Sequence, residues 1–188
     1  LDPKAELLVT AVDGKGRPKA VYSAEHDMRT AAVKFARIDE MMRQSHTIDA
    51  QIQEARNDPK TKDAADCAWL MSVMATRPGS EKDTGSEAKA YGATTLEGQH
   101  VVQTREGVRL QFIGKEGVWH DHIVHNKALA AMLLERKKKV GDSDQLFGVN
   151  EGQVNRFIGK LDGGHFSSKD FRTRRANQLA VHAMQRFE

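Results

Sequence analysis

The feature that most constrains the fold is a run of alternating apolar and polar residues in the middle of the chain. Apolar side chains recur at every second position in GVRLQFIG (107–114), and apolar residues also alternate with polar ones, less regularly, in GVWHDHIVHN (117–126) and ATTLEGQHVVQT (93–104). Short polar segments, REG and KEG, separate these stretches and are typical of tight turns. Alternation with a period of two predicts strands, because successive side chains of a strand point to opposite faces. We therefore predict one small three-stranded antiparallel sheet over residues 93–126, with Lys115 in its second turn.

Helical patterns lie on either side of this sheet. Apolar residues at helical spacing predict helices over residues 24–43, 47–56 and 62–75 before it, and over 126–140, 150–161 and 167–188 after it. The first residues, AELLVTAVDGKGRPKAVYS, predict two short strands around a glycine-rich turn. The sequence thus predicts a mainly α (α+β) fold, with an N-terminal hairpin or linker over residues 1–22 and a helical domain over residues 23–188.

One long segment of the predicted domain has no hydrophobic period. TRPGSEKDTGSEAKAYG (76–92) contains several glycines, many charges and little to bury. Long loops inside compact domains are often functional, and segments with few apolar contacts open easily. We expect a loop over residues 76–92 that is mobile in the absence of a ligand.

The overall charge is only mildly basic. Lys and Arg number 29 against 26 Asp and Glu, a formal net charge of +3. A nucleic-acid partner is therefore allowed but not required. Aromatic residues make up 6% of the chain, which argues against an RNA-binding protein built on stacking platforms. The sequence has no signal peptide and no apolar run long enough to span a membrane, so we expect a soluble protein of the cytoplasm or nucleoid, with no membrane partner and as a monomer.

Cysteine and histidine do not form a recognisable metal-binding pattern. Cys67 is the only cysteine, and its apolar helical surroundings predict a buried, unreactive thiol. His120, His122 and His125 are close in sequence, but on a strand the first two share one face and the third points away. We therefore predict no metal site and no bound cofactor.

The predicted C-terminal helix begins with an unusual number of positive charges. Cations are mildly unfavourable in the first turn of a helix, so either the helix presents a solvated face or an anion lies against it. Four cations surround the single carboxylate of Asp170, namely Lys169, Arg172, Arg174 and Arg175.

Arg77, Lys115 and Arg172 would each be unremarkable alone but are informative together. Two arginines can bind the non-bridging oxygens of a phosphodiester bidentately, and a lysine can protonate a leaving oxygen. No Walker-type glycine loop or acidic metal cluster accompanies them in the sequence. Nucleotide hydrolysis and metal-dependent nuclease chemistry are therefore not supported.

Three motifs in this order resemble the catalytic domain of type IB DNA topoisomerases of the small bacterial and poxviral kind. They are TRPGSEKDTGSEAKAYGATTLEGQHV, LQFIGKEGVWHDHIVHN and SSKDFRTRRAN, and DGKGRPKAVYSAEH is similar to the segment where that domain begins. The resemblance covers nearly the whole chain. It implies a mostly helical domain that binds duplex DNA and relaxes it through a 3′-phosphotyrosyl intermediate, without metal or nucleotide.

The resemblance also assigns roles to individual residues. Arg77 and Arg172 match the two catalytic arginines of the family, and Lys115 matches the general acid that protonates the 5′-oxygen. Lys169 and Asn177 match positions of further phosphate-contacting groups, and we expect Arg174 and Arg175 to contact DNA phosphate as well.

The end of the sequence departs from the family pattern. In the family a histidine and the nucleophilic tyrosine follow the second arginine, whereas His182 lies too close behind Arg172 and the only tyrosines are Tyr22 and Tyr91. We therefore expect a truncated catalytic domain that is inactive by itself. Two alternatives remain open: a tyrosine recombinase or integrase core, although Lys169 stands where recombinases usually have histidine, and a noncatalytic DNA-binding remnant.

Overall fold

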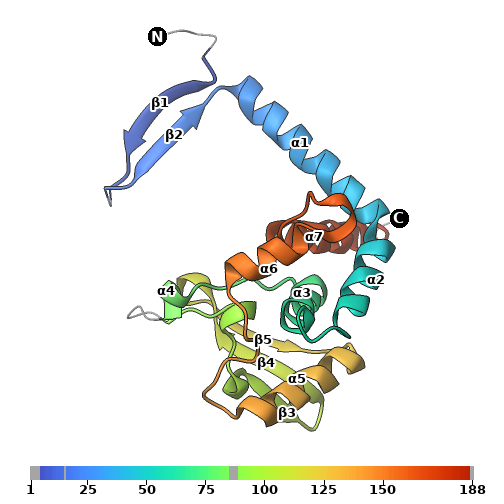
Figure 1. Ribbon diagram of the computed structural model, residues 1–188. Helices are drawn as coiled ribbons and strands as arrows, with labels where there is room; N and C mark the ends of the chain where they lie inside the picture. Colours follow the sequence, from blue (N-terminus) through green and yellow to red (C-terminus); the bar gives the residue numbers. More distant parts are fainter. Residues whose placement is uncertain (1–4, 15, 85–88, 187–188) are drawn as a thin grey trace. The chain divides into compact units, whose positions relative to one another are not determined.

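A computed structural model of the protein describes residues 5–14, 16–84 and 89–186, which form two compact units divided after Glu40. The predicted fold class is confirmed, since helices dominate and residues 101–123 contain a small antiparallel sheet (Figure 1). No helix in the described ranges is long and apolar enough to cross a membrane.

The first unit, residues 1–40, contains a β-hairpin and most of a long helix. Strands β1 (Leu7–Val12) and β2 (Pro18–Tyr22) pair antiparallel, and α1 (Ala24–Arg43) follows. The Asp13 carboxylate closes the turn by accepting hydrogen bonds from the backbone N–H of Arg17 at 3.0 Å and from its Nε at 2.8 Å. Ser23 caps α1, because its Oγ accepts from the backbone N–H of His26 at 3.1 Å. The predicted hairpin and helix start are confirmed.

The second unit, residues 41–188, is built around α3 (Lys62–Met74). Every residue from Ala65 to Ser72 is buried, as expected for a helix that is covered on all sides. Helices α2, α6 and α7 pack against α3 (Figure 1). The remaining elements of this unit are α2 (Ser45–Ala55), α4 (Glu81–Thr84), β3 (Val101–Thr104), β4 (Gly107–Ile113), β5 (Trp119–Ile123), α5 (Lys127–Val140), α6 (Glu151–Ile158) and α7 (Ser168–Met184).

The three strands of the second unit form a sheet in the order β3-β4-β5. Leu110 and Phe112 of β4 are buried on one face, opposite His122 and His120 of β5. The hairpin between β4 and β5 carries Lys115 at its tip, as predicted. The alternation of the sequence therefore located both strands and the turn of this hairpin.

The predicted start of the sheet was wrong, because β3 begins at Val101 and not at Ala93. Residues 93–95 and 98–100 form short 3-10 turns instead. Side chains stabilise both turns, since Thr95 Oγ1 accepts from the backbone N–H of Gly92 at 3.0 Å and His100 Nδ1 accepts from that of Glu97 at 2.9 Å. These local hydrogen bonds compete with strand pairing.

A buried ion network links α3 to its neighbours. The Asp66 carboxylate is completely buried and accepts hydrogen bonds from Arg56 Nε at 2.5 Å and from Arg136 at 2.6 Å and 3.1 Å. Lys62 Nζ lies 3.4 Å away, and Arg136 also binds Asp63 at 2.7 Å. Burial alone would raise the pKa of Asp66, but the arginine hydrogen bonds outweigh burial and hold this pKa below its ordinary value.

Candidate phosphate-binding site

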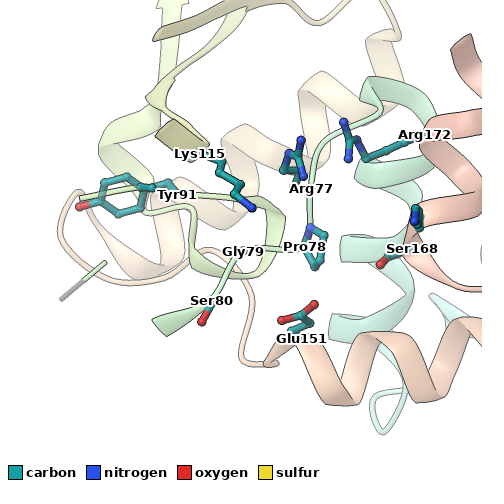
Figure 2. A pocket seen from close by; sticks show the side chains of 11 residues that line it. Arg77, Pro78, Gly79, Ser80, Tyr91, Lys115, Glu151, Ser168 and Arg172 are labelled. Carbon is teal, nitrogen blue, oxygen red and sulfur yellow. The ribbon is translucent and has the colours of Figure 1, made fainter. Parts of the chain in front are cut away.

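The second unit contains a pocket of about 370 Å³ where three separate segments meet. The segment after α3 contributes Arg77, the β4–β5 hairpin contributes Lys115, and the first turns of α7 contribute Lys169 and Arg172 (Figure 2). These residues are far apart in the sequence, and the fold brings their positive charges to one place. The three predicted catalytic residues therefore line a common pocket.

The backbone around Arg77 is held firmly on both sides. The Arg77 carbonyl accepts a hydrogen bond from the backbone N–H of Ala93 at 2.7 Å, and the Pro78 carbonyl accepts from that of Thr94 at 2.6 Å. Gly79 and Gly92 approach so closely that a Cβ on Gly92 would lie 2.5 Å from the backbone nitrogen of Gly79. Only glycine fits at this contact. The backbone that carries Arg77 is thus fixed by its own contacts, and Arg77 lines the pocket.

The mobility predicted for residues 76–92 remains a prediction. Residues 85–88 lie outside the described part of the chain, and α4 forms in the middle of the segment.

Lys115 owes its position to a tight hairpin. The backbone N–H of Gly114 donates to the Val118 carbonyl at 2.7 Å, and that of Gly117 donates to the Gly114 carbonyl at 3.1 Å. Glu116 and Gly117 adopt positive φ angles of 64° and 76°, which turn the chain sharply. Lys115 is exposed at this tip, and Figure 2 shows its side chain directed toward Arg77 and Pro78.

Arg172 projects from the first turns of α7, where Asp170 satisfies the helix start. The Asp170 carboxylate accepts from the backbone N–H and from the Oγ of Ser167, each at 2.8 Å. The single acid among these cations therefore stabilises the helix N-terminus, as a capping residue does. Asp170 is itself buried, whereas Arg172 is only half-buried.

The cations of the pocket differ from several other arginines of this unit in their partners. Among the described residues, no carboxylate forms an ion pair with Arg77, Lys115 or Arg172, while arginines elsewhere in this unit do form such pairs. Burial and the neighbouring positive charge of Arg77 lower the pKa of Arg172 below its ordinary value. Among the described residues, the only acidic side chain that lines the pocket is that of Glu151, at the start of α6. Converging, uncompensated cations of this kind are suited to binding an anion.

His120 lies beside this cluster, which the sequence did not reveal. It lines a second cavity of about 180 Å³, shared with Arg77, Lys115 and Arg172. Its ring stacks on Phe112, with ring centres 4.8 Å apart. Burial, followed by the charges of His122, Arg172 and Arg77, lowers the pKa of His120. The position of His120 could have been inferred only from the pairing of β5 with β4, which puts residues 120 and 112 on the same face of the sheet.

The other predicted phosphate contacts divide into two groups. Lys169 lines the pocket, and its contact with phosphate remains a prediction. Arg174 is 5% exposed and donates to Ser72 Oγ at 2.6 Å, so its buried guanidinium does not fit a phosphate-binding role. Arg175 lines a different cavity, beside β5. Asn177 lies five residues beyond Arg172, which puts its side chain about 140° further around α7.

The two tyrosines of the sequence belong to different units. Tyr91 lines the same pocket, but Figure 2 shows its hydroxyl directed away from Arg77. Burial, together with the charge and hydrogen bonding of Glu97, raises the pKa of Tyr91, which makes the phenol a weaker source of phenolate. Tyr22 belongs to the first unit, where its ring stacks on His26.

The described residues do not include a metal centre. No three side chains of His, Cys, Asp or Glu come close enough together within the described ranges to hold a metal ion. Cys67 is fully buried, and burial raises the pKa of its thiol, so it is not a reactive nucleophile.

Comparison with known proteins agrees with the geometry of the pocket. Residues 23–188 match the family described as eukaryotic DNA topoisomerase I, catalytic core. The chain is also 23% identical, over 198 residues, to a protein named DNA topoisomerase 1B from Acanthamoeba polyphaga mimivirus, and the match covers 97% of this chain and 59% of that relative. The chain thus spans well under two thirds of the length of the relative that it matches. On the family match, over most of its length, this chain belongs to the type IB DNA topoisomerase catalytic-core family.

Proposed function

We propose that this chain supplies the DNA-binding and transition-state-stabilising part of a type IB topoisomerase, which relaxes duplex DNA in the cytoplasm or nucleoid. The observation that carries the proposal is the convergence of Arg77, Lys115 and Arg172, for which the described part of the chain offers no carboxylate partner. A phosphodiester would supply the negative charge that these three cations need.

The proposed reaction is a transesterification at phosphorus. A tyrosine oxygen forms a bond to the phosphorus and loses its phenolic proton, while the bond from phosphorus to the 5′-oxygen breaks. Arg77 and Arg172 hold the non-bridging oxygens, whose charge grows in the transition state. Lys115 donates a proton to the departing 5′-oxygen. The reverse reaction reseals the strand after it has swivelled. Because the energy of the broken bond is kept in the phosphotyrosine, the reaction requires no nucleotide.

The first test measures binding of the isolated chain to duplex DNA by fluorescence anisotropy at increasing salt. Affinity should fall steeply with salt, because each neutralised phosphate releases counterions and contributes about −0.9 to the slope. Arg172→Ala should weaken binding and reduce the magnitude of the slope by about one phosphate contact. Lys138→Ala is the matched control, since Lys138 is exposed near the end of α5, outside the pocket. Absence of binding at low salt, or equal effects of both substitutions, would refute the proposal.

A second test concerns covalent chemistry. We expect the chain alone to form no covalent adduct with nicked or supercoiled DNA, because Tyr91 points away from the cations and its phenol is held near Glu97. Joining the chain to a tyrosine-bearing segment of the family should restore cleavage. In that longer protein Lys115→Ala should slow cleavage strongly, but much less when sulfur replaces the 5′-bridging oxygen, since a thiolate leaves without being protonated. Equal losses on both substrates would show that Lys115 is not the general acid. If the chain alone formed an adduct, the prediction that it cannot cleave DNA by itself would be wrong. Only the DNA-binding part of the proposal would then remain.

A further inference from the structure

The tip of the β4–β5 hairpin carries a cluster of exposed apolar side chains beside Lys115. Ile113, Val118 and Trp119 are 42%, 53% and 59% exposed. Ile113 and Trp119 are directly opposite each other in the register of β4 and β5, so they share one face of the hairpin. The backbone hydrogen bond from Gly114 to Val118 holds Lys115 between the two arms. We call these three residues the tip cluster.

Ordinary burial does not account for the tip cluster. Each of these side chains could have been polar without loss to the core, because the buried face of β4 is formed by Val108, Leu110 and Phe112. The rest of the exposed face is polar where it crosses the sheet, with Arg109 paired to Asp121 at 2.8 Å. An exposed apolar group at a projecting tip indicates a contact surface.

We infer that the tip cluster packs against the deoxyribose edge of the same DNA duplex that the pocket binds. The inference rests on the proposed function, which puts Lys115 at the departing 5′-oxygen. Trp119 is four residues from Lys115, at most about 14 Å along an extended chain. One strand of duplex DNA carries a phosphate every 3.4 Å or so along the axis, so this reach covers about four nucleotides next to the scissile phosphate. A duplex seated at Lys115 therefore passes over the tip.

The chemistry of the cluster fits a sugar edge. The carbon atoms of deoxyribose are apolar, and proteins that bind the minor groove already bring side chains such as Ile into contact with DNA by inserting them between base steps. The indole of Trp119 adds a single N–H donor, which can reach an acceptor on the groove wall while its ring covers the sugars.

A second copy of the chain fits the tip cluster less well than DNA does. A stable protein interface buries about 800 Å² on each partner, far more than three side chains supply. Extending the contact around the tip would bury Lys115, which has no carboxylate partner among the described residues. Burying an unpaired charge against another protein surface is costly, whereas DNA phosphate would neutralise it.

The test uses the two tryptophans of the sequence, which occupy opposite environments. Trp119 is exposed, whereas Trp69 is 8% exposed and lies under Arg56. Addition of duplex DNA should quench and shift the tryptophan emission of the parent chain. In Trp119→Phe the emission comes from Trp69 alone, and DNA should leave it unchanged although anisotropy still reports binding.

Affinity and its salt dependence distinguish this inference from the proposed function. Trp119→Ala should weaken DNA binding roughly tenfold, as expected for loss of one well-packed apolar contact, with no change in the salt slope. Val181→Ala is the matched control, because Val181 is 48% exposed on α7 and belongs neither to the tip cluster nor to the lining of the pocket, so we expect no change in affinity. Circular dichroism should show that the variants remain folded.

Each outcome of this experiment is decisive. If DNA binds with the expected salt slope but neither the emission nor the Trp119→Ala affinity changes, the inference is overturned and the proposed function stands. If DNA does not bind at low salt, both are overturned. If sedimentation shows a dimer that Trp119→Ala dissociates, the tip cluster is a contact between copies of the chain and the inference is again overturned.

Discussion

Two groups of positively charged side chains in the second unit differ in whether a carboxylate is paired with them. Around Asp66, the guanidinium groups of Arg56 and Arg136 are paired with a buried carboxylate and lie over aromatic rings, Trp69 at 3.9 Å and Phe147 at 4.7 Å. Around the pocket, Arg77, Lys115 and Arg172 converge without a carboxylate partner among the described residues.

We interpret the paired cations as groups that stabilise the fold, and the unpaired cations as groups that bind a ligand. A buried charge must be paired, because the interior cannot solvate it as water does. Charges at a half-exposed pocket can remain unpaired at modest cost, since water still reaches them. The cost appears as the lowered pKa of Arg172, caused by burial and by Arg77. Substitutions in the two groups should therefore have opposite consequences for stability and for DNA binding.

The largest effect is expected from breaking the paired group. Asp66→Asn leaves two arginines without their buried counter-charge and should lower the free energy of unfolding by about 3–5 kcal/mol. Urea denaturation followed by circular dichroism measures this change. Asp144→Asn, at an exposed carboxylate that pairs with no cation in the described ranges, should stay within about 0.5 kcal/mol of the parent. A loss below about 1 kcal/mol for Asp66→Asn would mean that the network contributes little to the fold.

An intermediate effect is expected where the pocket depends on close backbone packing. The Cβ of Gly92→Ala would lie 2.5 Å from the nitrogen of Gly79 and 2.7 Å from the carbonyl oxygen of Arg77. We expect a loss of about 1–3 kcal/mol in the free energy of unfolding, as for other overpacked sites, and weaker DNA binding because Arg77 is displaced. Thermal melting and anisotropy measure the two effects.

Gly152→Ala is the control for this substitution. A Cβ added at position 152, which lies in α6, would be 3.4 Å from the nearest atom. Its melting temperature should equal or slightly exceed that of the parent. Unchanged DNA affinity in Gly92→Ala would contradict the view that this contact positions Arg77.

A small effect on stability is expected from removing a charge of the unpaired group. Arg172→Ala relieves repulsion with Arg77 and removes no ion pair, so the free energy of unfolding should remain within about 0.5 kcal/mol of the parent. The same urea experiment that detects the Asp66→Asn loss measures it. A loss similar to that of Asp66→Asn would show that Arg172 supports the fold and is not reserved for a ligand.

The outline of the fold could be predicted from the sequence because local patterns determine it. Alternation located β4 and β5, and apolar residues at helical spacing located α1. Residues 93–100 were predicted as strand, since their pattern did not show that side chains of Thr95 and His100 would close 3-10 turns on the neighbouring backbone.

The candidate site was predictable only in part. Arg77, Lys115 and Arg172 were identified through family motifs, not through any local pattern that brings them together. Arg174 was included because it lies in the same basic stretch, yet its position on α7 directs it toward Ser72 of α3. His120 was missed as a neighbour of the site because strand register, and not sequence proximity, carries it there.

The smallest predicted effect is a shift in the titration of His120. Burial and the nearby positive charges lower its pKa below the ordinary value of about 6.5. The unfolded chain therefore binds a proton more readily than the folded chain, so the contribution of His120 to stability is complete above about pH 6.5 and falls as the pH drops toward the lowered value. Bound DNA phosphate should raise the pKa of His120 by neutralising Arg77 and Arg172. NMR titration of the free and DNA-bound chain would show this shift, and an identical pKa in the two states would exclude phosphate near His120.

The most direct test of the central claim is the stabilisation of the chain by DNA. A ligand that binds only the folded state at a hundredfold excess over its Kd adds about 2.7 kcal/mol to the free energy of unfolding. Urea unfolding of the parent and of Arg172→Ala should be measured with and without a short duplex at one fixed, low salt concentration. We predict that DNA stabilises the parent by about this amount and Arg172→Ala by much less, while the two proteins are equally stable without DNA. Equal stabilisation of both proteins by DNA would contradict the claim that the unpaired cations of the pocket are the DNA-binding site.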